Sequence, residues 1–392
     1  MVKGTRKKIV KPVQQATVRA AGESLVAAEI SAFRRKLMQW YRKNARKLPW
    51  RGVNDPYRTW VSEVMLQQTR VTAVIEHYNE FLLRFPTVLA LSLAREAEVL
   101  AAWSGLGYYR RARMLHKTAQ FITQERQGAL PTDSAGLRTL PGVGDYTAAA
   151  IASIAFGESV AVVDGNVERV LLRVTGRPHV STAAGRAFVQ AQANALVPRR
   201  KMEKGVNAAG DHNEAMMELG ATVCLPKAPL CAKCPVYSLC LTRGEHVTPV
   251  RAVQRSLPAA YLLSLRKQGT VTEVLLHRRV ADASLMAGML ELPGLPEESV
   301  TGREPLLRVR HAITNTNYYV QVFAARSARD RSLMKSLVGR EATLEWVRTT
   351  RLGGQPLTGL ARKVLQRLDV MEVRPVAWGR PAAIESREGD VL

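Results

Sequence analysis

Four cysteines, Cys224, Cys231, Cys234 and Cys240, lie together in the spacing C-x6-C-x2-C-x5-C, and the chain has no others. Cysteines that only fill a core would be scattered, and disulfides are disfavoured in a long chain without a secretory signal. Four thiolates on a compact loop can instead surround one metal centre. Zinc sites usually combine two short C-x2–4-C pairs, whereas this loop has one short pair and two long spacings. The spacing therefore favours a [4Fe–4S] cluster, with zinc as the alternative.

In SEVMLQQTRV, residues 62–71, the carboxylate Glu63 comes directly before a run of uncharged residues. Helical spacing predicts one continuous helix here, with Glu63, Gln67 and Arg70 on a different face from an apolar stripe. Taken alone, this pattern is typical of a solvated glutamate.

A second carboxylate, Asp164, stands before Gly165, Asn166 and an amphipathic segment in VDGNVERVLLRV. The simplest interpretation is that Asp164 caps the helix that follows. The alternative is that it works with Glu63. Cleaving an N-glycosidic bond needs an acid that helps the base leave and a negative group that stabilises the cationic sugar. Two carboxylates in different environments can divide these roles.

The sequence LPGVG at residues 140–144 predicts a tight turn followed at once by a helix of small residues. Glycines let the backbone approach a ligand, and a helix N-terminus offers free N–H groups, so the turn can hold one DNA phosphate. The preceding GLGYYRRARMLHKTAQF, residues 105–121, is predicted as a long helix. Its tyrosines beside basic residues suit wedging and phosphate contact. A plain turn, core aromatics and a solvated basic face are the alternatives.

The chain is strongly basic, with a net charge of +24 over 392 residues. Residues 1–60 hold 15 Lys or Arg and three acids, which is half of that excess. Such a surface attracts a polyanion, with nucleic acid first. No apolar run reaches the ~18 residues of a membrane span. No apolar segment follows the basic N-terminus, so we expect a cytoplasmic, nucleoid-associated protein without a membrane partner.

Further motifs carry a resemblance: LPWR, DPY, WVSEVMLQQTRV, WSGLGYYRRARMLH and NEAMMELGATVC, between about residues 47 and 240. Together with LPGVG, VDGNV and the cysteine loop, they resemble the helix-hairpin-helix DNA glycosylases with an iron–sulfur cluster. Within that superfamily they resemble the adenine DNA glycosylases (the MutY family). The resemblance implies a mainly α region at residues 25–244, built of a six-helix module and an iron–sulfur module with its cluster loop at 224–240, after a basic flexible tail at 1–24.

The resemblance also implies roles for single residues. Glu63 would be the general acid that protonates adenine N7, for which it needs a dry pocket. Asp164 would stabilise the oxocarbenium-like sugar, and Tyr146 and Asn166 would support this aspartate and the water. The remaining implied contacts are Arg51 and Glu214 to the flipped adenine, Gln68, Thr69 and Tyr108 near the opposing base, and Gly142, Val143 and Gly144 to a phosphate.

Related endonuclease III-like enzymes carry a lysine in the hairpin helix that forms a Schiff base with the sugar. The corresponding residue here is Tyr146, which implies a monofunctional adenine DNA glycosylase without strong strand cleavage. Two alternatives remain. One is a bifunctional glycosylase/lyase for oxidised pyrimidines, and the other is a non-catalytic iron–sulfur DNA-binding protein.

The C-terminal third predicts a linker at 245–258, an α+β domain at 259–375 and a tail at 376–392. AAYLLSL, VTEVLLHRR and YYVQVFAA are predicted strands, and ARKVLQRLDVM is a predicted helix. AGMLELPG and the strand order resemble the Nudix-like domain of the adenine glycosylases, which implies a check for 8-oxoguanine. The acidic helix of Nudix hydrolases is absent, so we expect no Mg²⁺. Where many family members have Phe-Ser-His, this chain has Ile313, Thr314 and Asn315.

The substrate that the resemblance implies is double-stranded DNA with an A:8-oxoguanine or A:G mispair, bound by a monomer.

Overall fold

The computed structural model describes residues 19–178, 182–199, 202, 205–246, 254–283, 285–313, 315–325, 330 and 343–372. The chain divides into two compact units. The first comprises Met1–Arg46 and Ala152–Pro249, and the second comprises Lys47–Ile151 and Val250–Leu392. These units are not contiguous in sequence, so they do not test the predicted bounds 25–244 and 259–375, which stay a prediction.

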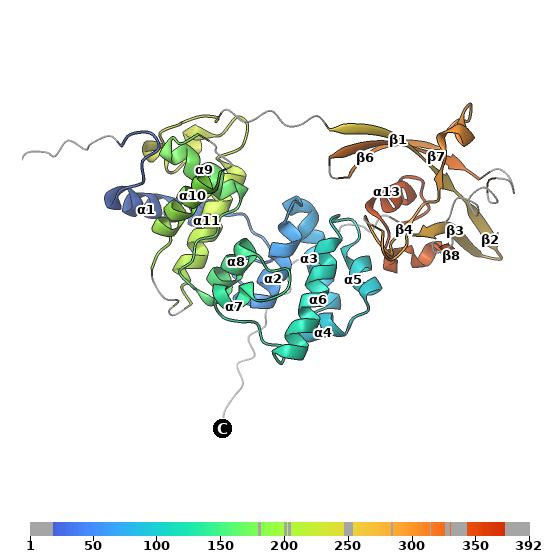
Figure 1. The fold of residues 1–392 in the computed structure, drawn as a ribbon, viewed down its shortest axis with the longest axis horizontal. Helices are drawn as coiled ribbons and strands as arrows, with labels where there is room; N and C mark the ends of the chain where they lie inside the picture. The colour runs from blue at the N-terminus through green and yellow to red at the C-terminus, as the bar shows by residue number, and fades with distance from the viewer. Residues whose placement is uncertain are drawn as a thin grey trace, which may run out of the picture. The chain divides into compact units, whose positions relative to one another are not determined.

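The first unit is a group of helices around one apolar core (Figure 1). The helices are α1 (Ala27–Asn44), α9 (Gly165–Thr175), α10 (Ala183–Leu196) and α11 (Ala208–Thr222). Each contributes side chains to that core, such as Phe33 of α1, Leu171 of α9 and Leu219 of α11, which are fully buried. The cysteine loop follows α11 and contains two short 3-10 turns, η1 (Cys231–Lys233) and η2 (Tyr237–Leu239).

The predicted N-terminal tail ends earlier than residue 24. The Arg19 side chain is buried and donates to the carbonyl oxygen of Val174 at 2.7 Å and to Glu29 at 2.9 Å. The amide of Gly22 donates to the carbonyl of Thr175 at 2.7 Å. Residues 19–22 are therefore anchored on α9, and the part of the predicted tail at 1–18 lies outside the described residues.

The second unit begins with helices around buried aromatic side chains, among them Trp60, Phe81 and Trp103. These helices are α2 (Pro56–Leu66), α3 (Val71–Arg84), α4 (Val88–Leu93), α5 (Glu96–Trp103), α6 (Arg110–Glu125) and α7 (Ser134–Arg138). The next helix, α8 (Asp145–Phe156), is the predicted helix of small residues, and the boundary between the units falls within it.

Two predicted helices are shorter than expected. The helix with Glu63 ends at Leu66, and α3 starts anew at Val71, so Gln67 and Arg70 do not share a helix face with Glu63. Residues 105–109 form a loop, and α6 begins only at Arg110. At both breaks, backbone carbonyls accept from the side chain of Arg111, which is distant in the chain from residues 67–70 but adjacent to the loop at 105–109.

The C-terminal part of the second unit has two four-stranded sheets. One has the order β5-β1-β7-β6, and in the other β3 pairs with β2, β4 and β8. The strands are β1 (Arg255–Leu263), β2 (Leu265–Gln268), β3 (Val271–Arg278), β4 (Leu290–Glu291), β5 (Gly294–Leu295), β6 (Leu307–Ile313), β7 (Thr316–Ala324) and β8 (Thr343–Arg348). Among its described residues lie also two 3-10 turns, η3 (Glu297–Val300) and η4 (Thr349–Gly354), and the helix α13 (Gly359–Arg367).

Successive side chains of a strand point to opposite faces of the sheet, so they enter two different cores. Val322 of β7 packs in the core that contains α13, whereas its neighbour Phe323 packs in a second core. Figure 1 shows α13 beside these strands. The three predicted strands overlap β1, β3 and β7, and the predicted helix at 361–371 corresponds to α13, which ends earlier, at Arg367. The predicted linker 245–258 is too long, because β1 already begins at Arg255. The predicted tail at 376–392 lies outside the described residues.

None of the helices in the described part of the chain is both long and apolar enough to cross a membrane.

Candidate functional site

The carboxyl group of Glu63 is buried, which excludes the solvated glutamate. Helix α2 begins at Pro56, with Asp55 as its cap accepting from the amide of Arg58 at 3.1 Å. This start puts Glu63 in the helix interior, where it is 4% exposed. The hydroxyl of Tyr146 on α8 donates to Oε2 of Glu63 at 2.6 Å. The resemblance implied a role for Tyr146 in supporting Asp164; in the structure its hydroxyl binds the carboxyl group of Glu63.

Asp164 caps α9, as its simplest interpretation predicted. Its Oδ1 accepts from the amides of Asn166 and Val167 at 2.9 and 2.8 Å, and its Oδ2 accepts from Asn166 Nδ2 at 2.7 Å. Three N–H groups and the positive end of the helix dipole thus stabilise the negative charge and fix the rotamer. The segment just before Asp164 is bound by Asn213 of α11. The side-chain amide of Asn213 donates to the carbonyl of Val160 at 2.9 Å and accepts from the amide of Val162 at 3.2 Å.

An arginine connects this carboxylate support to the cysteine loop. Arg169 Nη2 donates to Oδ1 of Asn166 and to the carbonyl of Gly220, both at 2.8 Å. Its Nε donates to the carbonyl of Cys224 at 2.8 Å. A Cβ on Gly220 would lie 2.5 Å from the Cβ of Asn166, so only glycine lets α11 approach this closely. Asn166, which donates to Asp164, is therefore held both by Arg169 and by the close packing of α11 at Gly220.

The LPGVG hairpin depends on Gly142. This residue has φ +73°, and a Cβ there would lie 1.9 Å from Cγ of Met114. Gly144, in contrast, has no atom within 4 Å of an added Cβ, so its backbone is open to a ligand. Asp145, which would repel a phosphate, forms an ion pair with Arg138 at 2.8 Å.

The two loops expected near the opposing base carry exposed side chains in an unusual backbone conformation. Gln68 has φ 56° and Tyr108 has φ 49°, both in the left-handed region that favours glycine. Tyr108 is 47% exposed, and Gln68 is also exposed. Arg111 of α6 bonds to both loops, and Thr69 is one of its acceptors, at 2.9 Å.

The two residues assigned to the flipped adenine belong to different units. Glu214 of α11 accepts from the hydroxyl of Tyr41 at 2.9 Å. Arg51 is half-buried in a turn, where its amide donates to the carbonyl of Leu48 at 3.1 Å. Each is ordered by its own unit.

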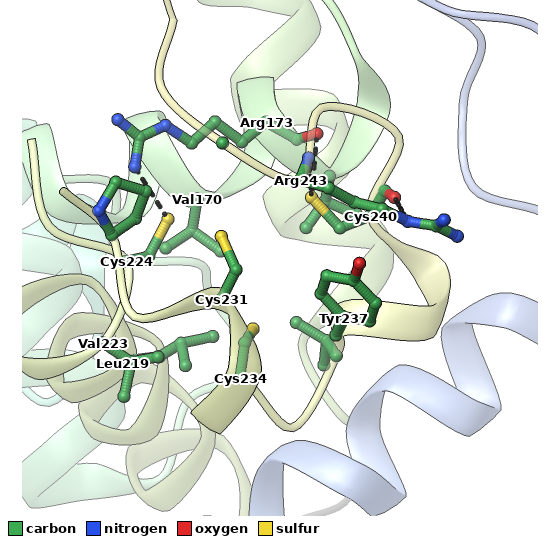
Figure 2. Close-up of a pocket in the computed structure, with 14 residues that line it drawn as sticks. Val170, Arg173, Leu219, Val223, Cys224, Cys231, Cys234, Tyr237, Cys240 and Arg243 are labelled. Carbon is green, nitrogen blue, oxygen red and sulfur yellow. Dashed lines mark hydrogen bonds between the residues drawn. The ribbon is translucent and has the colours of Figure 1, made fainter. Parts of the chain in front are cut away.

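The four cysteines line one recess together with apolar side chains of α9 and α11 (Figure 2). N–H groups point at two of the sulfurs: Arg173 donates to Cys224 Sγ, and the amide of Arg243 donates to Cys240 Sγ, each at 3.4 Å. Burial raises the pKa of the Cys234 thiol to about 11. Within the described residues, no three Cys, His, Asp or Glu side chains form a group that could hold a single metal ion.

A sulfur-lined recess with N–H donors at the sulfurs is the environment in which proteins keep iron–sulfur clusters. The residues present therefore fit a cluster held by Cys224, Cys231, Cys234 and Cys240.

In the C-terminal part, Ile313 ends β6 and Asn315 lies exposed in the following turn, while Thr314 falls outside the described residues. A buried acid, Glu291, accepts from Thr358 Oγ1 at 2.5 Å. Its burial raises the pKa to about 7.

Several residues that build the site were missed by sequence reasoning: Tyr41, Arg111, Arg169, Asn213 and Gly220. Only Gly220 had a sequence signal, because a glycine inside the helical pattern NEAMMELGATVC indicates close packing. The others act through contacts with residues far away in the chain, which no local pattern reveals.

Part of the chain is similar to known DNA repair proteins. Residues 61–185 match the family model described as HhH-GPD superfamily base excision DNA repair protein. The adenine DNA glycosylase of Homo sapiens is 45% identical over 227 residues, covering 55% of this chain and 40% of that protein. The adenine DNA glycosylase of Mycobacterium tuberculosis is 42% identical over 205 residues, covering 51% of this chain and 64% of that protein.

Among solved structures, a thermostable thymine-DNA glycosylase is similar with a TM-score of 0.50 and 27% identity, over 55% of this chain and 97% of that one. The matches to the curated relatives span 40% of the human protein and no more than about two thirds of the bacterial ones. Over these segments the chain is similar to the adenine DNA glycosylases, and its residues 61–185 match the HhH-GPD superfamily of base excision DNA repair proteins.

Proposed function

We propose that this protein is a monofunctional glycosylase that removes adenine mispaired with 8-oxoguanine or guanine in duplex DNA. The similarity to adenine DNA glycosylases supports the removal of adenine. The observation that carries the proposal is the buried Glu63 carboxyl group, 2.6 Å from the Tyr146 hydroxyl. A buried carboxylic acid whose orientation is held by a hydroxyl is suited to give its proton to a base bound in the same pocket.

In the proposed reaction, the target adenine leaves the stack, and Glu63 donates a proton to its N7. The bond between N9 and C1′ then breaks, and its electron pair goes to the departing base. Asp164, held by three N–H groups, stabilises the cationic sugar until a water adds to C1′ and gives its proton to the Glu63 carboxylate. The products are free adenine and an abasic site.

The phenol of Tyr146 cannot form a Schiff base with the sugar. Because it stands where endonuclease III-like lyases have lysine, we expect strand breaks only after alkali. No described feature favours the pyrimidine-specific alternative.

Duplex DNA is the proposed partner. The net charge of +24 supplies long-range attraction to its phosphates. The open backbone at Gly144 would receive one phosphate without sequence preference, and Gln68, Thr69 and Tyr108 would fill the gap left by the flipped base.

We propose a [4Fe–4S] cluster held by Cys224, Cys231, Cys234 and Cys240. When bound, it would fix the conformation of the loop whose Cys224 carbonyl accepts from Arg169. A visible absorption band and stoichiometric iron and sulfide, lost in Cys234→Ser, would support the cluster; stoichiometric zinc without the band would refute it.

Residues 259–375 are proposed to form a Nudix-like domain that reads the opposing base. Asn315 is exposed and keeps donor and acceptor groups. Asn315→Ala should reduce the preference for A:8-oxoguanine over A:G in base release. An unchanged preference would place the discrimination elsewhere.

The central test uses duplexes with A:8-oxoguanine, A:G, A:C and thymine glycol:A, with and without hot alkali. We expect adenine release first from A:8-oxoguanine, with breaks mainly after alkali. Breaks without alkali would favour the lyase, and binding without release would favour the non-catalytic alternative.

Two near-isosteric variants test the carboxylates. Glu63→Gln keeps an acceptor for Tyr146, and Asp164→Asn keeps a good helix cap, so both should fold. Each should slow release by about 10²-fold or more, as expected for loss of an acid or of electrostatic stabilisation. The matched control is Asp133→Asn at the cap of α7, where Asp133 accepts from Gly136 at 2.7 Å; it should leave release unchanged. Normal release by Glu63→Gln would remove Glu63 from the mechanism.

A further inference from the structure

The guanidinium of Arg111 lies at a junction of backbone carbonyls in the second unit. Its Nη1 donates to carbonyl oxygens at the end of α2 and just beyond it, those of Val64 (2.8 Å), Met65 (2.9 Å) and Gln67. Its Nη2 donates to Thr69 Oγ1 (2.9 Å) and to the carbonyls of Gly107 (3.2 Å) and Leu106 (3.4 Å). One side chain therefore binds two segments that are about forty residues apart in the chain.

Each of these segments contains one exposed, non-glycine residue with positive φ. Gln68 (φ 56°) lies between the acceptors Gln67 and Thr69, and Tyr108 (φ 49°) directly follows the acceptor Gly107. Side chains other than glycine adopt this conformation rarely, and it persists where the surroundings hold it. The hydrogen bonds of Arg111 to the neighbouring peptide groups are such a constraint.

The residue type matters at this junction. The Arg111 guanidinium also lies 5.4 Å from the ring centroid of Tyr108 and 5.5 Å from that of Trp103. Burial lowers the pKa of Arg111 to about 10, so it is still charged at neutral pH. A planar fork with five donors can serve both segments at once, whereas the compact ammonium of lysine cannot.

We propose that Arg111 is a positioning residue that holds Gln68 and Tyr108 as one rigid pair, so that both side chains enter the duplex together when the adenine flips. This inference rests on the proposed function. Without the guanidinium, each loop relaxes separately, and the flipped state is less populated while DNA attraction and fold persist.

The test compares Arg111→Lys with Arg95→Lys, the same change at an exposed arginine that pairs with Glu98 at 2.7 Å. Thr69→Val is a milder second variant, because it removes one acceptor and keeps the cation. Two readouts are single-turnover adenine release from A:8-oxoguanine duplex and the fluorescence of a 2-aminopurine placed next to the target adenine, which reports unstacking.

Arg111→Lys should lower both readouts by about tenfold or more, the equivalent of one hydrogen bond to a charged group. Thr69→Val should lower them less, and Arg95→Lys should not change them. Affinity for undamaged duplex and the melting temperature should stay close to those of the unaltered protein. In a Gln68→Ala, Tyr108→Ala background, Arg111→Lys should have no further effect on the fluorescence.

An equally large further loss in that background would show that Arg111 acts elsewhere, and it would overturn the inference. Unaltered release and fluorescence in both Arg111→Lys and Thr69→Val would overturn it as well. If the unaltered protein releases no adenine, the proposed function fails first, and this outcome is distinguishable from the others.

Discussion

The hairpin that is proposed to hold a phosphate should be lost when a single methyl group is added at Gly142. Two separate costs follow from the structure. Alanine must adopt φ +73°, which costs about 1–2 kcal/mol for a residue with a Cβ. The new Cβ must also displace Met114, whose Cγ and Sδ would lie 1.9 and 2.7 Å away, and such overpacking costs about 1–3 kcal/mol. Gly142→Ala should therefore lower the free energy of unfolding by about 2–5 kcal/mol.

A double-mutant cycle with Met114→Ala separates the two costs. Truncating Met114 removes Cγ and Sδ, so the double variant should recover the overlap cost of about 1–3 kcal/mol but not the backbone cost. The assay is urea unfolding of all four proteins. An effect of Gly142→Ala below about 0.5 kcal/mol, or strict additivity in the cycle, would refute this reasoning.

The matched control at the other hairpin glycine is Gly144→Ala. Its Cβ meets no atom within 4 Å and its φ lies outside the left-handed region, so stability should hardly change. Its affinity for duplex DNA should nevertheless fall, because the methyl group would occupy the space through which a phosphate approaches. Unchanged affinity would remove Gly144 from the proposed interface.

Three further outcomes are expected. Tyr146→Phe should slow adenine release about tenfold or more by removing the hydrogen bond to Glu63, and full activity in single-turnover assays would contradict that role. Gly220→Ala should displace Asn166, lower stability by about 1–3 kcal/mol and slow release, and an unchanged melting temperature would show that α11 can yield. The pKa of Glu291 is raised from 4.5 to about 7 by burial, so the folded state holds its proton more tightly than the unfolded state does. The protonated Glu291 therefore contributes about 3 kcal/mol to the free energy of unfolding below pH 4.5, and this contribution is lost as the pH rises towards 7. Glu291→Gln should flatten this pH dependence, measured by urea unfolding at several pH values. An unchanged pH dependence would refute the role of Glu291.

Features set by neighbours in the chain were predictable. The spacing of the cysteines placed their loop, and the order Asp-Gly-Asn before an amphipathic segment placed Asp164 as the cap of α9. The hairpin and its helix followed from two glycines and a run of small residues. In each case the partners lie within a few residues, so the local pattern contains the interaction.

Helix ends near the candidate site were not predictable in this way. The apolar period continues from α2 into α3, and it predicted one helix through residues 61–75. At the break at 67–70, carbonyls that would continue the helix bond instead to Arg111, some forty residues later in the chain. A local period contains no information about such a distant donor.

The same division applies to Glu63. By itself, the sequence determined that an acid would stand on an amphipathic helix, and the family resemblance implied a hairpin helix that carries tyrosine in place of lysine. Tertiary structure alone decided that the acid is buried and bound by Tyr146, a partner 83 residues away. Solvation depends on which surfaces pack over a side chain, and that packing forms only when distant segments of the chain meet.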